Sequence, residues 1–248
     1  MPERLAALRA AGDAIRILTN NTTLTVPGMA AALCEAGLPV KADEIVAGQD
    51  LMASMLAERG FPARGPVYTL GAPALGETLR AAGLAPRDLV ADAPTADATG
   101  PCALVLGYLA APDAELLASA LALLLRPDCL FLALHRNRVF KNAGRLELGL
   151  GAWVAALETA SGREALITGK PAPAIFRRAL ASLGAAPGDV AMVGDDPFAD
   201  LAPARALGLR TVFVLSGKYA DASILDALPA DARPDHVIPS LAELPDAL

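Results

Sequence analysis

The sequence predicts an α/β protein with a doubly wound, mostly parallel sheet and a second α/β domain inserted into it. Short apolar runs of strand length, such as residues 102–106, recur along the chain. They alternate with amphipathic segments of helix length, such as residues 174–183, in which Ile175, Phe176 and Ala179 share one face. This alternation is typical of parallel sheets covered by helices. Polar or charged side chains directly follow three of the expected strands.

Composition limits the class of protein. The chain has 248 residues, of which 54% are hydrophobic and 19% charged, so it can bury a large core in one or two domains. A net charge of −6 lacks the basic footprint of nucleic-acid binding, so we expect no nucleic-acid partner. Apolar runs such as residues 116–125 are too short to span a bilayer, and Pro2-Glu3-Arg4 does not open a signal peptide. We therefore expect no membrane partner and a cytoplasmic location.

The three cysteines, Cys34, Cys102 and Cys129, are widely spaced within apolar runs. Their odd number and their spacing favour reduced thiols in the core of a cytosolic protein over a disulfide framework. A metal-binding or catalytic role is the less favoured alternative.

The first expected strand ends in a polar cluster. A short helix over residues 2–11 leads to a strand over 15–18, and the segment Thr19–Thr23 then precedes a helix over 26–36. Hydroxyl and amide donors, backbone N–H groups and a helix N-terminus together favour an anion such as phosphate at this place. The alternative is that these threonines and asparagines only cap the helix.

The middle of the chain indicates an α/β domain in its own right. A helix over residues 49–59 runs into the Gly- and Pro-rich segment 60–66, which we interpret as a domain hinge. Beyond it, the expected strands cover residues 67–70, 102–106 and 130–134, the expected helices cover 73–82 and 113–125, and a polar, alanine-rich connection covers 89–99.

His135 follows the last of these strands beside two arginines, in the segment 135–138. Such a segment can recognise an anionic substrate, and the alternative is a surface histidine with ordinary hydrogen bonds. Gly149 and Gly151 precede a helix around Trp153. A G-x-G without the third glycine and without the surrounding strand–helix unit is a weak sign of dinucleotide binding.

Lys170 follows a short strand over residues 165–168 and precedes the helix over 174–183. It is one of only four lysines among 21 basic residues, which indicates that a compact ammonium group is needed at this strand end. Such a charge can neutralise phosphate and hold a neighbouring carboxylate in place. The alternative is an ordinary solvated lysine in a loop.

The most informative stretch comprises residues 189–208. Apolar residues 190–193 indicate a buried strand, and residues 198–207 indicate a helix. Asp195 and Asp200 therefore lie near the carboxyl end of a strand, where open α/β sheets bind ligands and where carboxylates can hold a hard cation such as Mg²⁺. The alternative is that Asp196, Asp200 and their neighbours are turn and N-cap residues. The chain ends in expected strands over 211–215 and 236–238 and an expected helix from Ser240.

In this order, with a large insertion between the first two, the three strand-end motifs resemble those of the haloacid dehalogenase-like hydrolase superfamily. The resemblance is to the subgroup with a large α/β cap after the second motif. That subgroup includes nucleotide monophosphatases, pyridoxal phosphate phosphatase and phospholysine phosphohistidine inorganic pyrophosphate phosphatase. The segments that carry the resemblance are ILTNNTT, ALHRNRVFKNAGRLELGLGAWVAALE, ITGKPAP and VGDDPFADLAPARALGLRTVFVLSGKY.

The resemblance implies catalytic roles for Thr19 and Lys170. Thr19 matches the second motif, whose hydroxyl holds the transferring phosphoryl group, and Asn20 and Asn21 line the same substrate-binding loop. Lys170 matches the third motif, which counters the charge of the phosphoryl oxygens and of the nucleophile. The implied substrate is a small phosphorylated compound.

The resemblance also implies Mg²⁺ as the cofactor. Asp195 matches the acidic motif that binds the ion, and Asp200 matches its supporting carboxylate. His135 lies in the expected cap, which closes over the site and selects the leaving group, so we expect it to bind substrate. The implied activity is Mg²⁺-dependent hydrolysis of small phosphate esters or related phosphoryl compounds, a reaction that depends on positioning and charge neutralisation.

The chain departs from the family in one respect. Family members begin with a strand that ends in Asp-x-Asp, whose first Asp is the nucleophile, and no Asp-x-Asp occurs in these 248 residues. We expect that the first core strand is missing, through a gene start assigned too far downstream or a truncation. Whether this protein is an enzyme is thus open, and the 248-residue chain is expected to be inactive. The alternatives are a pseudoenzyme that binds phosphometabolites and an enzyme with another nucleophile.

The expected domains are a haloacid dehalogenase-like core over residues 1–61 and 162–248 and an inserted α/β cap over 62–161. Relatives with this type of cap often pair through it. The resemblance therefore implies a homodimer formed through the cap.

Overall fold

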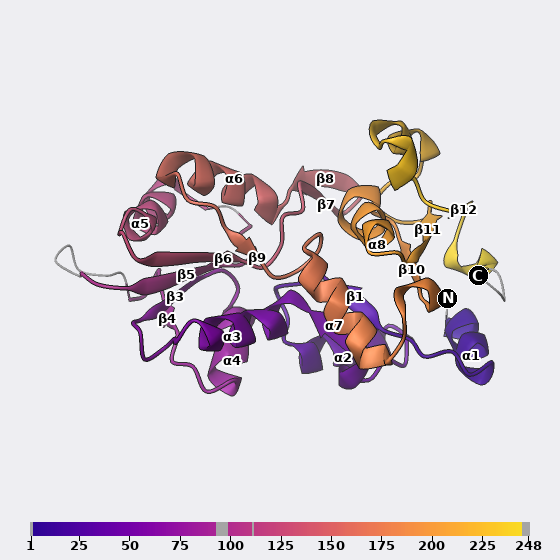
Figure 1. Cartoon of the computed structure of the whole chain (residues 1–248), viewed down its shortest axis with the longest axis horizontal. Coiled ribbons are helices and arrows are strands. Elements are labelled where there is room, and N and C mark those ends of the chain that lie inside the picture. The colour runs from indigo at the N-terminus through magenta and orange to yellow at the C-terminus, as the bar shows by residue number, and fades with distance from the viewer. Residues whose placement is uncertain (1, 93–98, 111, 245–248) are drawn as a thin grey trace. The chain divides into compact units, whose positions relative to one another are not determined.

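The computed structural model describes residues 2–92, 99–110 and 112–244 (Figure 1). The chain divides into two compact units. The first unit comprises Met1–Leu18, Met29–Val46 and Lys170–Leu248, and the second unit comprises Thr19–Gly28 and Ala47–Gly169. Both contain parallel strands and helices, so the predicted α/β class is confirmed.

The second unit contains a five-stranded sheet in which every pairing is parallel. In spatial order, its strands are β4 Arg87–Asp88, β3 Val67–Leu70, β5 Cys102–Leu106, β6 Cys129–Ala133 and β9 Leu166–Ile167. Every residue of β3 and β5 is buried. Continuous apolar runs such as these are expected for parallel strands that are covered on both faces.

Helices cover both faces of this sheet. Figure 1 shows α3 Gly48–Glu58 and α4 Pro73–Ala81 on one face, and α5 Ala114–Leu124 and α6 Leu150–Ser161 on the opposite face. Asp113 begins α5, because its carboxylate accepts a hydrogen bond from the backbone N–H of Leu116 at 2.8 Å. Leu79 of α4 and Leu123 of α5 are fully buried in one core cluster with the strands. The second unit is therefore a doubly wound α/β layer structure.

A β-hairpin that the sequence analysis does not predict follows β6. It consists of β7 Val139–Asn142 and β8 Arg145–Leu148, which pair antiparallel. Its turn holds Ala143 at φ 46° and Gly144 at φ 81°. Positive φ at both central residues is typical of Asn-Gly turns, and Ala-Gly does not signal it. Phe140 of β7 packs edge-on against Tyr108, with 5.2 Å between the ring centroids.

The first unit is built around three parallel strands, β10 Ala191–Gly194, β11 Arg210–Val214 and β12 His236–Ile238, in that order. Alternate residues of β11 enter different clusters: Phe213 packs with Leu201 and Leu225, and Val212 packs with Ile238. A separate two-stranded sheet pairs β1 Ile17–Thr19 with β2 Ile45–Ala47. The remaining α-helices are α1 Pro2–Ala10, α2 Val26–Glu35, α7 Pro173–Leu183 and α8 Ala202–Ala206. The 3₁₀-helices are η1 Ala42–Glu44, η2 Pro187–Asp189, η4 Ala222–Ala227, η5 Ala230–Ala232 and η6 Leu241–Glu243.

The helix expected over residues 198–207 is wrong in its form. The structure has a π-helical turn, η3 Pro197–Leu201, followed by the short helix α8. The N–H of Leu201 reaches back five residues to the carbonyl of Asp196 at 3.4 Å. Pro203 lacks the N–H group that a continuous α-helix requires at its position. The helix expected from Ser240 is only η6, with residues 245–248 outside the described residues.

Two segments that the sequence analysis assigns to the core domain pack with the second unit. The strand β9 pairs with β6, and Leu56 of α3 joins the large core cluster together with Phe61. The segment 60–66, expected to be a hinge, thus lies inside the second unit. Within the expected connection 89–99, residues 93–98 lie outside the described residues. The expected domain boundaries stay a prediction.

The expectation of three buried thiols is correct for Cys102 and Cys129 and wrong for Cys34, which is exposed. Cys34 lies on α2, where Met29 is the buried residue.

The longest of the α-helices given above is α6, with 12 residues. Across residues 2–92, 99–110 and 112–244, none of the helices combines the length and the apolar character needed to cross a bilayer.

Candidate functional site

Three aspartates and two lysines gather where β10 ends, in the first unit. Asp200 Oδ1 lies 2.7 Å from Lys170 Nζ, and Asp196 Oδ2 lies 2.6 Å from Lys218 Nζ. Asp195 Oδ2 accepts a hydrogen bond from the backbone N–H of Lys218 at 2.7 Å. The turn after β11 therefore completes a charged cluster that begins with the residues after β10.

Asp196 has a second task within this cluster. Its Oδ1 accepts hydrogen bonds from the backbone N–H groups of Phe198 and Ala199, both at 3.0 Å, and so caps the π-helical turn. The N-cap interpretation is thus correct for Asp196. Asp200 is buried and takes part in an ion pair instead.

The carboxylates influence one another. Burial, the largest effect, raises the pKa of Asp200, Lys170 opposes this rise, and the charges of Asp196 and Asp195 add to it. A buried carboxylate that loses its partner is strongly destabilising. The two ammonium groups are therefore needed to keep three neighbouring carboxylates in one place.

Two glycines leave room for the carboxylates. A Cβ atom on Gly194 would lie 2.7 Å from Asp200 Oδ2, and a Cβ atom on Gly217 would collide with the carboxylate of Asp195. Any larger residue at either position would displace the acid beside it. The glycines at these two strand ends are therefore part of how the cluster is built.

The donor set suits a hard cation such as Mg²⁺, which prefers carboxylate oxygens. Within the described ranges, no group of three or more His, Cys, Asp or Glu residues surrounds a common metal position. Mg²⁺ keeps several waters and usually takes only one or two protein carboxylates together with substrate phosphate. Asp195 and Asp200, which Gly217 and Gly194 leave room for, therefore fit this ion.

The segment Thr19–Thr23 belongs to the second unit and forms a hydrogen-bonded turn. Thr19 Oγ1 accepts a bond from the N–H of Asn21 at 3.0 Å. Asn21 Oδ1 accepts bonds from the N–H groups of Thr23 at 2.9 Å and Leu24 at 3.1 Å. Asn21 thus shapes the turn before α2, but its bonds end at Leu24 and do not reach the helix, which begins at Val26.

Asn20 is held by a residue that the sequence analysis does not select. Its Nδ2 donates a hydrogen bond to Asn137 Oδ1 at 2.8 Å. On its other side, a Cβ atom on Gly169 would lie 2.6 Å from Asn20 Oδ1. The amide of Asn20 is thus enclosed from both sides by residues of the second unit, which defines its orientation.

The backbone that carries Asn137 is itself clamped by the G-x-G pair. The carbonyl oxygen of Asn137 accepts a hydrogen bond from the N–H of Gly151 at 2.9 Å. A Cβ atom on Gly151 would lie 2.6 Å from the carbonyl oxygen of Arg136, and one on Gly149 would collide with that of Asn137. The two glycines therefore permit a close backbone approach, which explains the pattern without a dinucleotide.

His135 is buried, so the alternative of a surface histidine is wrong. Its Nδ1 accepts a hydrogen bond from the N–H of Asn137 at 3.3 Å. The backbone turns after β6 so that the N–H of Asn137 meets the ring of His135, and this local turn is not visible in the spacing of the residues.

The sequence-predicted residues fall into two groups. Lys170, Asp195 and Asp200 come together in the first unit. The segment Thr19–Asn21 and His135 belong to the second unit, where hydrogen bonds link Asn20 and His135 through Asn137.

Lys218 was missed, although a signal for it existed. It is another of the four lysines, and it closely follows the expected strand over residues 211–215. Like Lys170, Lys218 is a rare lysine that follows a strand, so the same pattern in the sequence points to it.

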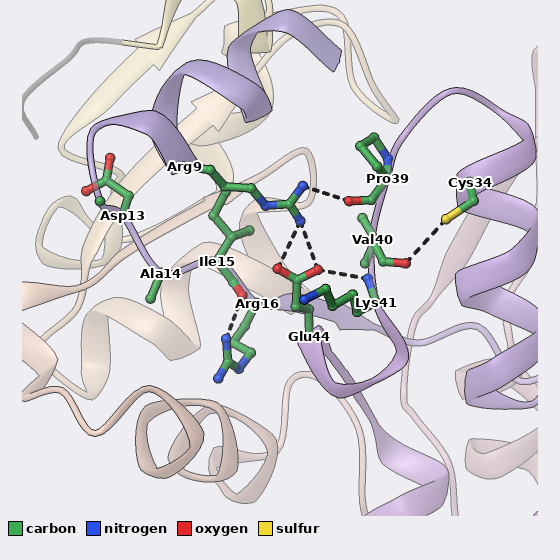
Figure 2. A pocket seen from close by; sticks show the side chains of 11 residues that line it. Arg9, Asp13, Ala14, Ile15, Arg16, Cys34, Pro39, Val40, Lys41 and Glu44 are labelled. Carbon is green, nitrogen blue, oxygen red and sulfur yellow. Dashed lines mark hydrogen bonds and ion pairs between the residues drawn. The ribbon is translucent and has the colours of Figure 1, made fainter.

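The first unit has a cavity of 540 Å³, and none of the candidate site residues lines it. Figure 2 shows the guanidinium of Arg9 turned towards the carboxylate of Glu44 and the carbonyl of Pro39. Arg16 donates hydrogen bonds to Ser182. These cations are engaged by the protein itself, so the cavity is lined by structural interactions.

The chain matches known families at both ends. Residues 1–85 match the family described as Haloacid dehalogenase-like hydrolase, and residues 167–244 match the family described as HAD-hyrolase-like. These ranges contain Thr19, Asn20 and Asn21 in the first case and Lys170, Asp195 and Asp200 in the second.

Similarity to individual proteins extends over the whole chain. Glycerol-3-phosphate phosphatase from Gallus gallus is 33% identical over 265 residues, covering 100% of this chain and 85% of the relative. A solved structure of p-nitrophenyl phosphatase from Archaeoglobus fulgidus is 32% identical with a TM-score of 0.78, covering 96% of this chain and 88% of that one. Glycerol phosphate phosphatase from Mycobacterium tuberculosis, in complex with magnesium, is 28% identical with a TM-score of 0.77, covering 97% of this chain and 69% of that one. The chain therefore belongs to the haloacid dehalogenase-like hydrolase family.

Proposed function

We propose that this chain is a Mg²⁺-dependent hydrolase of the phosphatase type, directed at small phosphate esters or related phosphoryl compounds. The observation that carries the proposal is the buried Lys170–Asp200 ion pair in the carboxylate cluster with Asp195. A fixed ammonium group among carboxylates suits a reaction that depends on positioning and on neutralising negative charge. The relatives named above are phosphatases, which supports the same class of substrate.

In this proposal Lys170 offsets negative charge on the phosphoryl oxygens, and Thr19 contributes its hydroxyl group to hold them. Asn20 and Asn21 complete the loop, one through its oriented amide and the other through the turn that it stabilises. Asp200 holds the ammonium group of Lys170 in position, at 2.7 Å. The ammonium group of the lysine is therefore held in position before substrate binds.

Asp195 and Asp200 are the proposed residues that hold Mg²⁺. The ion would act as a Lewis acid that offsets charge developing on the phosphoryl oxygens. Asp195 receives a neutral backbone donor from Lys218, whereas Asp200 is paired with an ammonium group. Asp195 is therefore the stronger electrostatic partner for a cation, and Asp200 is the supporting one.

His135 is the proposed substrate-binding residue of the expected cap. Its Nδ1 accepts a hydrogen bond from the N–H of Asn137. The ring is held by the same residue that orients Asn20. Substrate contacts of the cap and of the phosphate-binding loop would thus be coupled through Asn137.

We infer that the 248-residue chain releases no phosphate by itself, because it contains no Asp-x-Asp. In the family that the sequence resembles, this motif supplies the nucleophile, and without it no covalent aspartyl intermediate can form. The test compares the 248-residue chain with a chain extended by any in-frame codons upstream of Met1, on a panel of phosphate esters with Mg²⁺. Each form is also tested with Asp195→Asn.

Turnover by the extended chain that is lost in Asp195→Asn is the expected result. Mg²⁺-dependent phosphate release by the 248-residue chain, again lost in Asp195→Asn, would refute the inferred inactivity. If both forms of the chain lack turnover and also fail to bind phosphate, the proposed function itself is refuted.

The alternative function is a non-catalytic module that binds phosphometabolites. It is favoured by the pair of lysines at one site in a chain without Asp-x-Asp. This alternative expects calorimetric binding of inorganic phosphate with no turnover, in the 248-residue chain and in any extended chain alike.

The proposal includes a homodimer formed through the cap expected over residues 62–161 and a cytoplasmic location. Sedimentation of the purified chain at micromolar concentration tests the first part, and a single monomeric species would contradict it. Fractionation of the source cells tests the second.

A further inference from the structure

Cys102 and Cys129 lie side by side in the second unit. They are the first residues of β5 and β6, and they are register partners in this parallel pair. Neighbouring strands lie roughly 4.8 Å apart, and register partners point to the same face of the sheet. A disulfide bond requires Cα atoms about 4.4–6.8 Å apart. The backbone thus places the two thiols within bonding range of each other.

The two thiols differ in their chemistry. The hydrogen bond with Cys129 lowers the pKa of Cys102 to about 7, against the effect of burial and with help from the charges of Arg126 and Arg163. The same hydrogen bond and burial raise the pKa of Cys129. Of the two, Cys102 is therefore the thiol that ionises near neutral pH and can act as the nucleophile, while Cys129 stays protonated.

Arg163 anchors the turn that leads into Cys129. Its guanidinium group donates hydrogen bonds to four carbonyl oxygens of this turn, those of Leu124, Arg126, Pro127 and Cys129. These bonds fix a positive charge beside the start of β6. The position of that charge is therefore a property of the fold and not of a mobile side chain.

Arg126 adds a second positive charge. Its Nη2 donates to the carbonyl oxygen of Gly100 at 2.5 Å, two residues before Cys102. Its Nε and Nη1 atoms are buried, and they have no hydrogen-bond partner among the described residues. Buried donors of a cation are costly unless negative charge lies nearby. The thiolate of Cys102 supplies such a charge.

We propose that Cys102 and Cys129 form a redox-active dithiol, which a hydroperoxide converts into an intramolecular disulfide between β5 and β6. In the first step the sulfur of Cys102 attacks a peroxide oxygen, so that an S–O bond forms and the O–O bond breaks. The oxygen that leaves takes up a proton and departs as an alcohol, or as water when hydrogen peroxide is the oxidant.

In the second step the sulfur of Cys129 attacks the sulfenic acid on Cys102. An S–S bond forms, the S–O bond breaks, and the hydroxyl group leaves as water with the thiol proton of Cys129. Two thiols and one hydroperoxide thus give one disulfide, one alcohol and one water. Two electrons pass from the sulfurs to the peroxide.

Tryptic digestion separates the pair Cys102 and Cys129 from Cys34. Trypsin cuts after Lys and Arg but not before Pro, so the bond between Arg126 and Pro127 stays intact. Cys102 and Cys129 therefore fall in one peptide, residues 88–136, whereas Cys34 falls in the peptide 17–41. The exposed Cys34 serves as an internal reference, since it would be oxidised first if accessibility alone determined which thiol reacts.

The full chain is reduced, treated with hydrogen peroxide, blocked with N-ethylmaleimide and digested without reducing agent. The expected peptide 88–136 carries no label and has a mass lower by two hydrogen atoms. Cleavage before its aspartates should leave the fragments with Cys102 and Cys129 linked until dithiothreitol is added. Cys34→Ser should leave this result unchanged.

Other outcomes would overturn the proposal. Labelling of both Cys102 and Cys129 after peroxide treatment would show that the pair does not react, and oxygen added to Cys102 without a link would show that Cys129 does not resolve the sulfenic acid. Links from either residue to Cys34 would show that the register does not direct the bond. A second measurement uses Cys129→Ala, in which dimedone should capture a sulfenic acid on Cys102. The mapping of the unmodified chain decides the matter even if this variant does not fold.

Discussion

The sheets of the two units are both parallel where their main strands pair, yet they bury these strands very differently. Every residue of β5 in the second unit is buried, whereas every residue of β10 in the first unit is only half-buried. β5 has a strand on each side, and β10 pairs with β11 alone among the described strands. Both strands are apolar runs. The burial of a strand therefore depends on its neighbours in the sheet and not on its own apolar character.

The cores show the same contrast. In the second unit, one large hydrophobic cluster includes residues of both the strands and the helices. In the first unit, residues of β11 belong to two hydrophobic clusters with four buried residues each. The first unit instead places five charged residues at the end of β10. The comparison indicates that apolar packing dominates the stability of the second unit and that paired charges matter more in the first.

The largest effect is expected from breaking the buried ion pair of the first unit. Lys170→Met leaves Asp200 without its counter-charge, and removing one partner of a buried pair costs about 3–5 kcal/mol. Urea denaturation of the chain at neutral pH measures the free energy of unfolding. The control combines Lys170→Met with Asp200→Asn, which should recover most of the loss. A single variant as stable as the parent would show that pairing is unimportant there.

A matched pair of valines tests the difference in packing directly. Val105 of β5 is fully buried, and Val193 of β10 is half-buried. Val105→Ala should cost roughly 2–3 kcal/mol, because two methyl groups leave a closed core. Val193→Ala should cost less than half as much in the same denaturation experiment. Equal losses would mean that β10 is packed as tightly as β5.

Within the second unit, a smaller effect is expected from a polar contact. Asn137→Ala removes the acceptor for Asn20 and should cost about 1 kcal/mol of unfolding free energy. It should also shift the side-chain amide resonances of Asn20 in a nitrogen–proton NMR spectrum. Asn137→Asp keeps an acceptor oxygen and should restore both. Unchanged Asn20 resonances in Asn137→Ala would show that Asn137 does not orient the loop.

The smallest effect concerns acid stability at β11. Burial raises the pKa of Asp235, but hydrogen bonds from Arg205 and Thr211 outweigh it and hold this pKa below its ordinary value of 3.8. A carboxyl group with a lowered pKa in the folded state stabilises the fold above the pKa of the unfolded state, and this stabilisation is lost as pH falls through the folded pKa. The advantage of the parent chain over Asp235→Asn should therefore be constant above about pH 5 and shrink below it.

The control for this pH series is Asp226→Asn. Asp226 pairs with Arg233 at 3.2 Å but is largely exposed, and exposed ion pairs contribute little. Denaturation curves of both variants from pH 7 down to the acid transition make the comparison. An advantage of the parent over Asp235→Asn that does not change with pH would contradict the assigned charge interactions.

Elements that depend on a local pattern could be predicted closely. The strands expected over residues 67–70, 102–106 and 236–238 have these bounds in the structure. Each is a short run of residues with a proline directly beside it, namely Pro66, Pro101 and Pro239. The hairpin β7–β8 was missed because Ala143 occupies a left-handed position that its type does not signal. The π-helical turn was missed because its spacing of acids and apolar residues also suits an α-helix.

The candidate site was predicted in part for a similar reason. A lysine or an aspartate just behind an apolar run is visible in the sequence, and so Lys170 and Asp195 could be selected, whereas Asp200 was selected from its spacing after Asp195. Asn137 could not be selected in this way, because its role comes from the turn of chain between β6 and β7 and from the clamp of Gly149 and Gly151.

By itself, the sequence determined the α/β class, the places of most helices and strands, and the polar residues at strand ends, since all of these depend on residues a few positions apart. Only the tertiary structure decided which sheet each strand joins, which aspartate each lysine faces, and that Asn137 holds Asn20. Lys218 and Asp196 are 22 residues apart in the chain, and Asn20 and Asn137 are 117 apart. Contacts over such separations depend on the order of the strands in space, which no local pattern of residues specifies.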